Sequence, residues 1–370
     1  MKVPEGFLLS GINCGIKRGK RLDLGLIFCK NGAVACGFFT KNSNPSYSVV
    51  VSKKNIKNSI KALVVNSGNA NCFTDKKDLL NTIKLCKSLA RELNIKEENV
   101  LIASTGKIGQ SLPFSKITKS LSKLCEKLNI NKRNIKSFAE SILTTDTHRK
   151  VSFREIEVKR KKIKILGFSK GAGMINPELA TMLAFIITDA KITKSLLKNI
   201  AKEAVEESFN SISVDGCTST NDSVIFLASK ESWQVKDKQS IAKFKMALKQ
   251  VCRELAKMIV KDGEGSTKFI QINIKGAKTQ REAKLAFKAI SSSVLFRASM
   301  YGKNPNWGRI VASLGQAGIK LSEDKFRVKT TPLKNREINI IVNLGRGNYS
   351  WCGWCCDITP NYININAKYN

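Results

Sequence analysis

The chain has 370 residues, of which 42% are apolar, and a formal net charge of +35 at pH 7. This length suits one large domain with a smaller one, or two comparable halves. The N-terminus lacks the long apolar core of a signal peptide, and no uncharged apolar run approaches the ~20 residues that cross a bilayer, so we expect a cytoplasmic protein without a membrane partner.

The basic residues are mostly lysines, spread along the chain from Lys2 to Lys368. A dedicated nucleic-acid site would be local, richer in arginine, and accompanied by exposed aromatic residues that stack on bases. We therefore expect a lysine-rich solvated surface and no nucleic-acid partner. A basic nucleic-acid-binding protein is the competing hypothesis, and it predicts tight binding that weakens steeply with salt.

Eleven cysteines, an odd number, are scattered through apolar contexts. In a cytosolic protein this usage predicts reduced thiols that pack as small hydrophobic residues. Cys352 and Cys355 form a Cys-x-x-Cys pair, but a zinc site would want a second pair of Cys or His ligands, which the sequence lacks. We expect no metal.

Short apolar runs and helical spacing predict the elements of the first half of the chain. Strands are expected at 24–29, 33–39, 62–65 and 100–103, with two more within 151–166, and helices at 77–93, 114–128 and 134–143.

The second half continues in the same alternating manner. Strands are expected at 182–187, 224–228 and 268–274, and helices at 193–209, 239–261 and 280–296. A composition break near Gly276 suggests a smaller C-terminal domain over 276–370. Interleaved strands and helices make the class α/β or α+β.

The segment from Gly171 to Ala190 reads Gly-Ala-Gly-Met-Ile-Asn-Pro-Glu-Leu-Ala-Thr-Met-Leu-Ala-Phe-Ile-Ile-Thr-Asp-Ala. It places Thr181 between a glycine-rich, turn-forming stretch and an apolar run typical of a fully buried strand. Thr181 is then either a packing residue or, if the chain cuts its own Ala180–Thr181 bond, an N-terminal nucleophile whose α-amine is the base.

The sequence holds one histidine, His148, which any serine or cysteine hydrolase with a histidine base would have to use. It holds no Gly-x-Ser-x-Gly elbow, His-Glu-x-x-His helix or dinucleotide fingerprint. An N-terminal threonine needs no histidine, because an α-amine titrates at roughly 7.7 to 8.0, near the pH that a general base wants.

Further segments complete a pattern with 171–190: Gly37–Thr40, Val65–Asn71, Ser104–Gly109, Thr144–Thr147, Val214–Asp222, Asp262–Gly265, Asn304–Ile310 and Asn366–Tyr369. Over essentially the whole chain, and in this order, they resemble the ornithine acetyltransferase family, the bifunctional glutamate N-acetyltransferases of arginine biosynthesis.

The resemblance implies a self-cleaving α/β (α+β) sandwich, in which helices surround two stacked β-sheets, with an N-terminal-nucleophile-like fold and a smaller C-terminal α/β domain. Cleavage before Thr181 would leave an α chain, 1–180, and a β chain, 181–370. In the β chain, 181–275 would complete the sandwich. The two chains would stay associated, usually as a dimer of αβ heterodimers.

The implied reaction moves acetyl from N-acetylornithine to glutamate by a ping-pong route through an acetyl-Thr181 ester, without metal or organic cofactor. Thr105 and Gly106 would hold the oxyanion. The sequence leaves open whether acetyl-CoA also serves as acetyl donor to glutamate.

The resemblance assigns substrate binding to Thr147, Lys170, Thr181, Glu264 and Asn366. Lys170 would pair with an α-carboxylate and Glu264 with an amino group. Family members usually end in hydroxyl residues that contact substrate, whereas this sequence ends at Asn370, directly after Tyr369. Either the affinity for substrate is reduced, or the Asn370 amide or carboxylate supplies that contact.

A self-cleaving amidase or aminopeptidase of related fold is the alternative enzyme. The acceptor discriminates the two, because transfer requires glutamate whereas a hydrolase releases its product without it.

Overall fold

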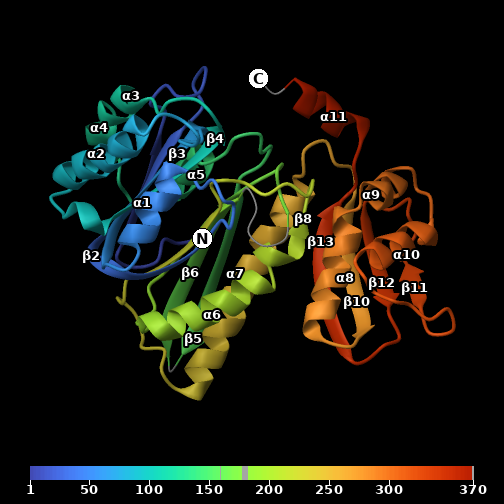
Figure 1. Ribbon diagram of the computed structural model, residues 1–370. Coiled ribbons are helices and arrows are strands. Elements are labelled where there is room, and N and C mark those ends of the chain that lie inside the picture. The colour runs from blue at the N-terminus through green and yellow to red at the C-terminus, as the bar shows by residue number, and fades with distance from the viewer. Residues whose placement is uncertain (159, 177–181, 369–370) are drawn as a thin grey trace. The chain divides into compact units, whose positions relative to one another are not determined.

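The computed structural model describes residues 1–158, 160–176 and 182–368 (Figure 1). The chain forms two compact units. Unit 1 comprises Met1–Gly171, Leu179–Val205 and Thr218–Leu255, and unit 2 comprises Ala172–Glu178, Glu206–Cys217 and Ala256–Asn370. Within the described ranges, no helix is both long and apolar enough to span a bilayer.

Unit 1 contains most of the elements of the first 255 residues. Its strands are β1 (Phe7–Ile12), β2 (Leu24–Phe39), β3 (Ile60–Asn69), β4 (Val100–Lys107), β5 (Lys150–Val158), β6 (Lys161–Lys170), β7 (Leu183–Thr188) and β9 (Ser223–Ala228). Its helices are α1 (Tyr47–Asn55), α2 (Lys77–Glu92), the 3-10 turn η1 (Glu97–Asn99), α3 (Phe114–Thr118), α4 (Leu121–Glu126), α5 (Lys132–Ser141), most of α6 (Lys194–Glu206) and the larger part of α7 (Lys238–Lys261).

The described strands of unit 1 form one sheet in the order β4-β3-β2-β9-β7-β6-β5, with β1 also paired to β2. Strand β2 spans the two strands predicted at 24–29 and 33–39, which are therefore one element. Its register with β3 shifts between Phe28 and Ala33, close to Gly32 at φ 81°, and the later part of β2 pairs with β9 instead. The irregularity marks the point where β2 passes from one half of the sheet to the other.

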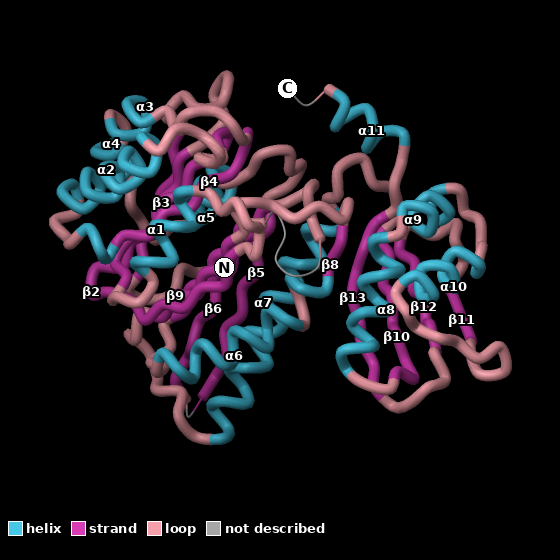
Figure 2. Tube along the Cα trace, in the orientation of Figure 1, coloured by secondary structure: helices cyan, strands magenta, loops and turns pink. Residues whose placement is uncertain are grey.

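The two halves of this sheet share one core. Alternating residues put Leu63 and Val65 of β3 into the same apolar cluster as Phe168 of β6 and Phe185 of β7, with Phe138 of α5 packed edge-on against Phe168. Helices cover the outer faces: residues of α2 and α4 join the cluster on the other side of β3 and β4, and α7 packs on β6 at Gly167. Figure 2 shows this layering of helices and strands in unit 1.

Unit 2 has its own sheet and core. Its strands are β8 (Ile212–Ser213), β10 (Phe269–Ala277), β11 (Arg327–Thr330), β12 (Glu337–Asn343) and β13 (Tyr349–Cys356), and its helices are the 3-10 turn η2 (Phe209–Ser211), α8 (Gln280–Ser292), α9 (Val294–Tyr301), α10 (Trp307–Gln316) and α11 (Pro360–Ala367). The sheet order is β11-β12-β10-β13-β8, and α8 packs on β10 and β13. The predicted fold class is confirmed: a mixed α/β protein with two sheets flanked by helices.

Two predicted helices are each divided. The helix expected at 280–296 ends at Ser292, because Ser293 adopts an extended conformation and its side chain accepts the Phe296 N–H to cap α9. The helix expected at 114–128 is likewise two short helices, α3 and α4, separated after Thr118.

Candidate active site

The carboxyl ends of β3 and β4 bring the predicted oxyanion residues together. The two strands are parallel, and Gly68 pairs with Gly106 where the register shifts. Gly106 has φ 140°, and a Cβ there would lie 2.3 Å from the Gly68 carbonyl carbon, so only glycine fits. Thr105, immediately before it, is buried.

Buried amide side chains brace this end of the sheet. Asn66 Oδ1 accepts a hydrogen bond from Ser104 Oγ (2.7 Å), and Asn66 Nδ2 donates to the Asn69 carbonyl (2.9 Å). Asn69 Nδ2 in turn donates to the Gln110 carbonyl (3.0 Å). The polar segment at the end of β3, which carries part of the family resemblance, thus fixes Ser104 before Thr105 and the loop at Gln110 after it.

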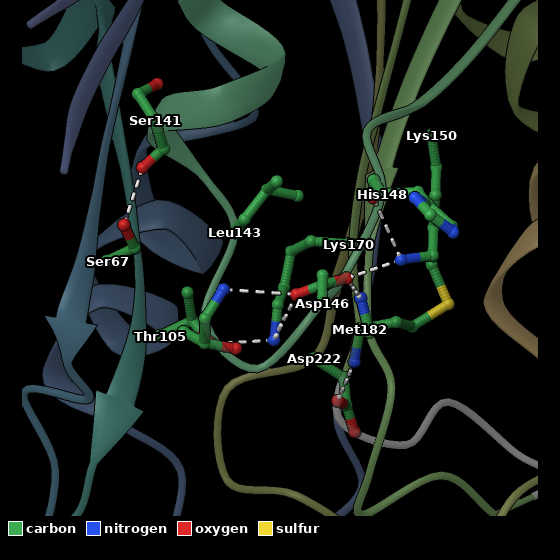
Figure 3. Close-up of polar contacts among 12 residues, drawn as sticks. Ser67, Thr105, Ser141, Leu143, Asp146, His148, Lys150, Lys170, Met182 and Asp222 are labelled. Carbon is green, nitrogen blue, oxygen red and sulfur yellow. Dashed lines mark hydrogen bonds and ion pairs between the residues drawn. The ribbon is translucent and has the colours of Figure 1, made fainter. Parts of the chain in front are cut away.

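Lys170, the last residue of β6, reaches Thr105 (Figure 3). Its Nζ lies 3.3 Å from Thr105 Oγ1 and 4.0 Å from Asp146 Oδ2, and its side chain is 3% exposed. Asp146 Oδ1 also accepts hydrogen bonds from Lys150 Nζ and the Gly171 N–H, both at 2.6 Å. Two ammonium groups therefore lie within 4.0 Å of one buried carboxylate.

The electrostatics of Asp146 follow from these contacts. Burial alone would raise the pKa of its carboxyl group, but the charges of Lys170 and Lys150 and the Gly171 hydrogen bond outweigh burial and lower that pKa. Asp146 is thus a carboxylate that holds Lys170 beside Thr105. No sequence pattern predicted a role for Asp146, although it lies in the segment Thr144–Thr147 that carries part of the family resemblance.

In unit 2, Glu264 and Asn366 lie together. Asn366 Nδ2, near the end of α11, donates to Glu264 Oε2 (3.0 Å), and the Glu264 N–H donates to the Ala172 carbonyl (2.8 Å). The Glu264 carboxylate lies against Gly173, where an added Cβ would come within 2.4 Å of Oε2. Gly173 therefore makes room for this carboxylate.

A second carboxylate of unit 2, Asp215, holds the chain before the predicted cleavage segment. It accepts hydrogen bonds from the Ile175 N–H (2.9 Å), the Cys217 N–H (3.1 Å) and the Met174 N–H. Met174 has φ 58°, a left-handed conformation that a bulky side chain rarely adopts. Burial raises the pKa of Asp215, against the opposing effect of these N–H groups.

The structure thus places the predicted site residues in two groups, with Thr105, Gly106, Thr147 and Lys170 in unit 1 and Glu264 and Asn366 in unit 2. Thr147 is exposed and directly follows Asp146. The remaining predicted residues, Ala180, Thr181 and Asn370, lie outside the described residues.

The Cys-x-x-Cys pair lies on β13. Side chains alternate along a strand, so Cys352 and Cys355 point to opposite faces, and Cys352 is exposed whereas Cys355 is buried. The two thiols do not converge on one point. Across the described ranges, no group of three or more Cys, His, Asp or Glu side chains is arranged to hold a metal ion.

The ArgJ family model matches residues 8–370. The chain belongs to the ArgJ family. A relative from Thermotoga neapolitana, the arginine biosynthesis bifunctional protein ArgJ, is 36% identical over 400 residues that cover the whole of both chains. A glutamate N-acetyltransferase from Methanocaldococcus jannaschii is 41% identical over 400 residues, which cover 99% of this chain and 97% of the relative.

The crystal structure of ArgJ from Bacillus halodurans is 34% identical and covers 48% of this chain and 96% of that one, with a TM-score of 0.45. Membership of the ArgJ family, over nearly the full length, makes this protein an acyltransferase of arginine biosynthesis. The resemblance drawn from the sequence motifs is thereby confirmed.

Proposed function

We propose that this ArgJ family member transfers an acetyl group from N-acetylornithine to glutamate, through an acetyl ester on Thr181. The observation that carries the proposal is the buried cluster at the ends of β4 and β6. There, a threonine hydroxyl lies beside an ammonium group that a carboxylate holds in place. The relative named glutamate N-acetyltransferase, similar along its whole length, supports glutamate as the acceptor.

Self-cleavage would come first. The Thr181 hydroxyl attacks the Ala180 carbonyl carbon, the peptide C–N bond breaks, and the hydroxyl proton passes to the departing nitrogen. Water then opens the resulting ester, which leaves a carboxylate on Ala180 and a free α-amine and hydroxyl on Thr181. The left-handed Met174, on the approach to this bond, favours a strained ground state.

In turnover, the Thr181 hydroxyl attacks the acetyl carbonyl while its own α-amine takes the proton. The amine returns that proton to ornithine as it leaves, and the reverse sequence delivers acetyl to glutamate. Thr105 and Gly106 would stabilise the negative oxygen that forms in each step. A buried hydroxyl held next to Lys170 suits this role, because a donor in a desolvated site stabilises charge more than one in water.

Substrate recognition would use charge complementarity. We assign the substrate carboxylate to Lys170 and the amino group to Glu264, with Thr147, Asn366 and Asn370 as further contacts. The two ammonium groups gathered at Asp146 support the first assignment. Desolvated charges left unpaired by a neutral analogue would make the site reject it.

We further propose that the cleaved chains remain paired as αβ heterodimers and dimerise, and that no organic cofactor or metal takes part. Nine of the eleven cysteines are buried or half-buried, as expected of reduced thiols that pack as small apolar side chains, and this usage supports a reducing compartment such as the cytoplasm.

The proposal is tested on purified protein by denaturing gels, intact mass and N-terminal sequencing. We expect two fragments, the second beginning Thr-Met-Leu-Ala, and a single uncut chain for Thr181→Ala. Glutamate acetylation is then assayed with N-acetylornithine and with acetyl-CoA separately, which also decides between one and two activities. Release of product at the same rate without glutamate would favour the amidase alternative, and a wild-type chain that stays uncut would refute the proposal.

The oxyanion assignment has its own test. Thr105→Ala should slow acetyl transfer by about 10²- to 10³-fold, roughly 2.7–4 kcal/mol of barrier, because one oxyanion donor is removed. Thr118→Ala is the matched control, since Thr118 Oγ1 donates only to local carbonyls of α3. Equal rates for the Thr105 variant and wild type would remove this assignment.

A further inference from the structure

Asn221 links β4, directly before the oxyanion residues, to the loop that follows β3. Its buried Nδ2 donates to the Ser104 carbonyl (2.8 Å) and to the Ala70 carbonyl (2.6 Å), and both of its hydrogens are thereby used. The Ser104 carbonyl belongs to the same rigid peptide plane as the Thr105 nitrogen. Asn221 therefore fixes the orientation of the backbone from which Thr105 projects.

Asp222, the next residue, holds the strand that follows Thr181. Its Oδ1 accepts the Met182 N–H (2.9 Å), and the side chain is completely buried (Figure 3). Met182 directly follows Thr181 in sequence, so Asp222 anchors the first described residue after the predicted cleavage position. The Asp222 carbonyl also accepts the Thr40 N–H (3.0 Å), which fixes the aspartate itself.

Both residues immediately precede β9, a strand in the interior of the unit 1 sheet. At its first residue, Ser223 pairs with Phe39 of β2 on one side and with Leu183 of β7 on the other. Successive residues of extended chain point in opposite directions, so one dipeptide can reach two neighbours. Asn221 reaches Ser104 in β4 and Ala70 after β3, and Asp222 reaches Met182 just before β7.

We propose that Asn221 and Asp222 are positioning residues: Asn221 holds the backbone that carries the Thr105 oxyanion donor, and Asp222 holds Met182, the residue that follows the proposed nucleophile in sequence. The inference rests on the proposed function and deepens it. Attack on a carbonyl requires the nucleophile and the oxyanion donors to be aligned, and a displacement of about 1 Å costs on the order of 10²-fold in rate. Two hydrogen-bonding side chains on adjacent residues directly before a central strand would supply such alignment.

The chemistry of Asp222 allows a conservative variant. Burial raises the pKa of its carboxyl group well above the ordinary value, although the charge of Lys170 opposes this effect. Its Oδ2 lies near the Thr40 hydroxyl, but that hydroxyl donates to the Ser219 carbonyl (2.6 Å), and Oδ2 has no hydrogen-bond partner among the residues described. Asparagine therefore keeps the acceptor for the Met182 N–H and gives up no hydrogen bond of the second oxygen.

The experiment compares variants with matched controls in the full-length chain. Asp222→Ala is paired with Asp189→Ala, because Asp189 is also buried and accepts the Lys164 N–H (2.8 Å), but lies just past the other end of β7. That end is about 20 Å from Met182 at the ordinary rise of a strand. Asn221→Ala is paired with Asn55→Ala, since Asn55 donates to the carbonyl of Val100 at the start of β4 (2.9 Å).

Cleavage is followed as the loss of uncut chain with time after cell-free synthesis, and acetyl transfer is measured per cleaved molecule. We expect Asp222→Ala and Asn221→Ala to slow cleavage on the order of 10- to 100-fold and to lower kcat with little change in KM. Asp222→Asn should restore most of the cleavage rate. Both controls should cleave at the wild-type rate, whatever their melting temperatures.

Three results would overturn the inference: wild-type cleavage rates in both alanine variants, equal slowing by the controls, or an Asp222→Asn variant as slow as Asp222→Ala. Each of these results is compared with a wild-type chain that cleaves itself and transfers acetyl. If the wild-type chain does neither, the proposed function is refuted, so failure of the inference and failure of the proposed function are distinguishable.

Discussion

Asp146 in the loop after α5 and Asp222 in the loop before β9 are both buried carboxylates, yet their surroundings differ. Asp146 faces two ammonium groups and the Gly171 N–H, and its pKa is lowered. Asp222 accepts the Met182 N–H, with Lys170 acting only as a more distant charge, and its pKa is raised. Burial is common to both, so the partners decide which form each group prefers.

The comparison separates two ways of holding a backbone. A carboxylate between lysines holds the chain as part of an ion cluster, and its removal takes a negative charge away from buried positive charges. A carboxylate bound to one amide acts as a hydrogen-bond acceptor, and an amide oxygen can replace it. Asp→Asn substitution should therefore destabilise the protein at position 146 and be tolerated at position 222.

The largest expected effect is from Asp146→Asn. Loss of this charge removes a buried carboxylate that lies within 4.0 Å of both Lys150 Nζ and Lys170 Nζ, which should lower the free energy of unfolding by about 3–5 kcal/mol. Urea denaturation in a Thr181→Ala background measures this, because every variant there is the same uncut chain. Asp222→Asn in that background is the control, and equal losses for the two variants would invalidate the comparison.

A smaller effect is expected from pH, with opposite signs at the two sites. The lowered pKa of Asp146 gives stability that is present above its unfolded pKa of about 3.9 and is lost as pH falls through the folded value. The raised pKa of Asp222 gives stability that is present below about pH 3.9 and is lost as pH rises through the folded value.

Urea denaturation from pH 3 to 8 therefore separates the two. The free energy of unfolding of Asp146→Asn should be lower than that of its parent chain, by an amount that shrinks towards acid pH. For Asp222→Asn, the free energy of unfolding should rise relative to that of its parent as pH rises. Parallel profiles for both variants would show that the two carboxyl groups titrate alike.

The smallest effect is expected for an exposed ion pair, which has neither the burial of Asp146 nor that of Asp222. Lys245 Nζ lies 2.6 Å from Glu203 Oε2, but the two side chains are 37% and 47% exposed. Water screens such pairs, so Lys245→Ala should change the free energy of unfolding by about 1 kcal/mol or less. A loss comparable to that of Asp146→Asn would show that burial does not distinguish the two pairs.

The sequence predicted regular elements best where a pattern was long and its ends were capped. Helix α7 at Lys238–Lys261 matches the prediction at 239–261, and α8 begins at Gln280 as expected, where Thr279 accepts the Glu282 N–H. The break at Ser293 was missed because apolar spacing continues through it. A serine that caps a second helix was the available signal.

Only those site residues that belong to motifs of the family could be predicted from the sequence. Thr105 and Lys170 were found in this way, and the structure brings them to 3.3 Å. Asp146, Asn221 and Asp222 were given no role, because their contacts depend on which strands are neighbours. No local pattern shows that β9 lies beside β2 and β7, some 190 and 40 residues away in sequence.

The order of strands in unit 1 has a consequence for how the chain is made. Strands β7 and β9, from beyond residue 181, lie between β2 and β6, from before it, and six residue pairs join β2 to β9 and another six join β6 to β7. A ribosome must therefore deliver β9 before the sheet can close, which makes assembly depend on contacts of long sequence separation. A cut before Thr181 would then act on an already folded polypeptide. The two products would stay together, because strands of one lie hydrogen-bonded between strands of the other.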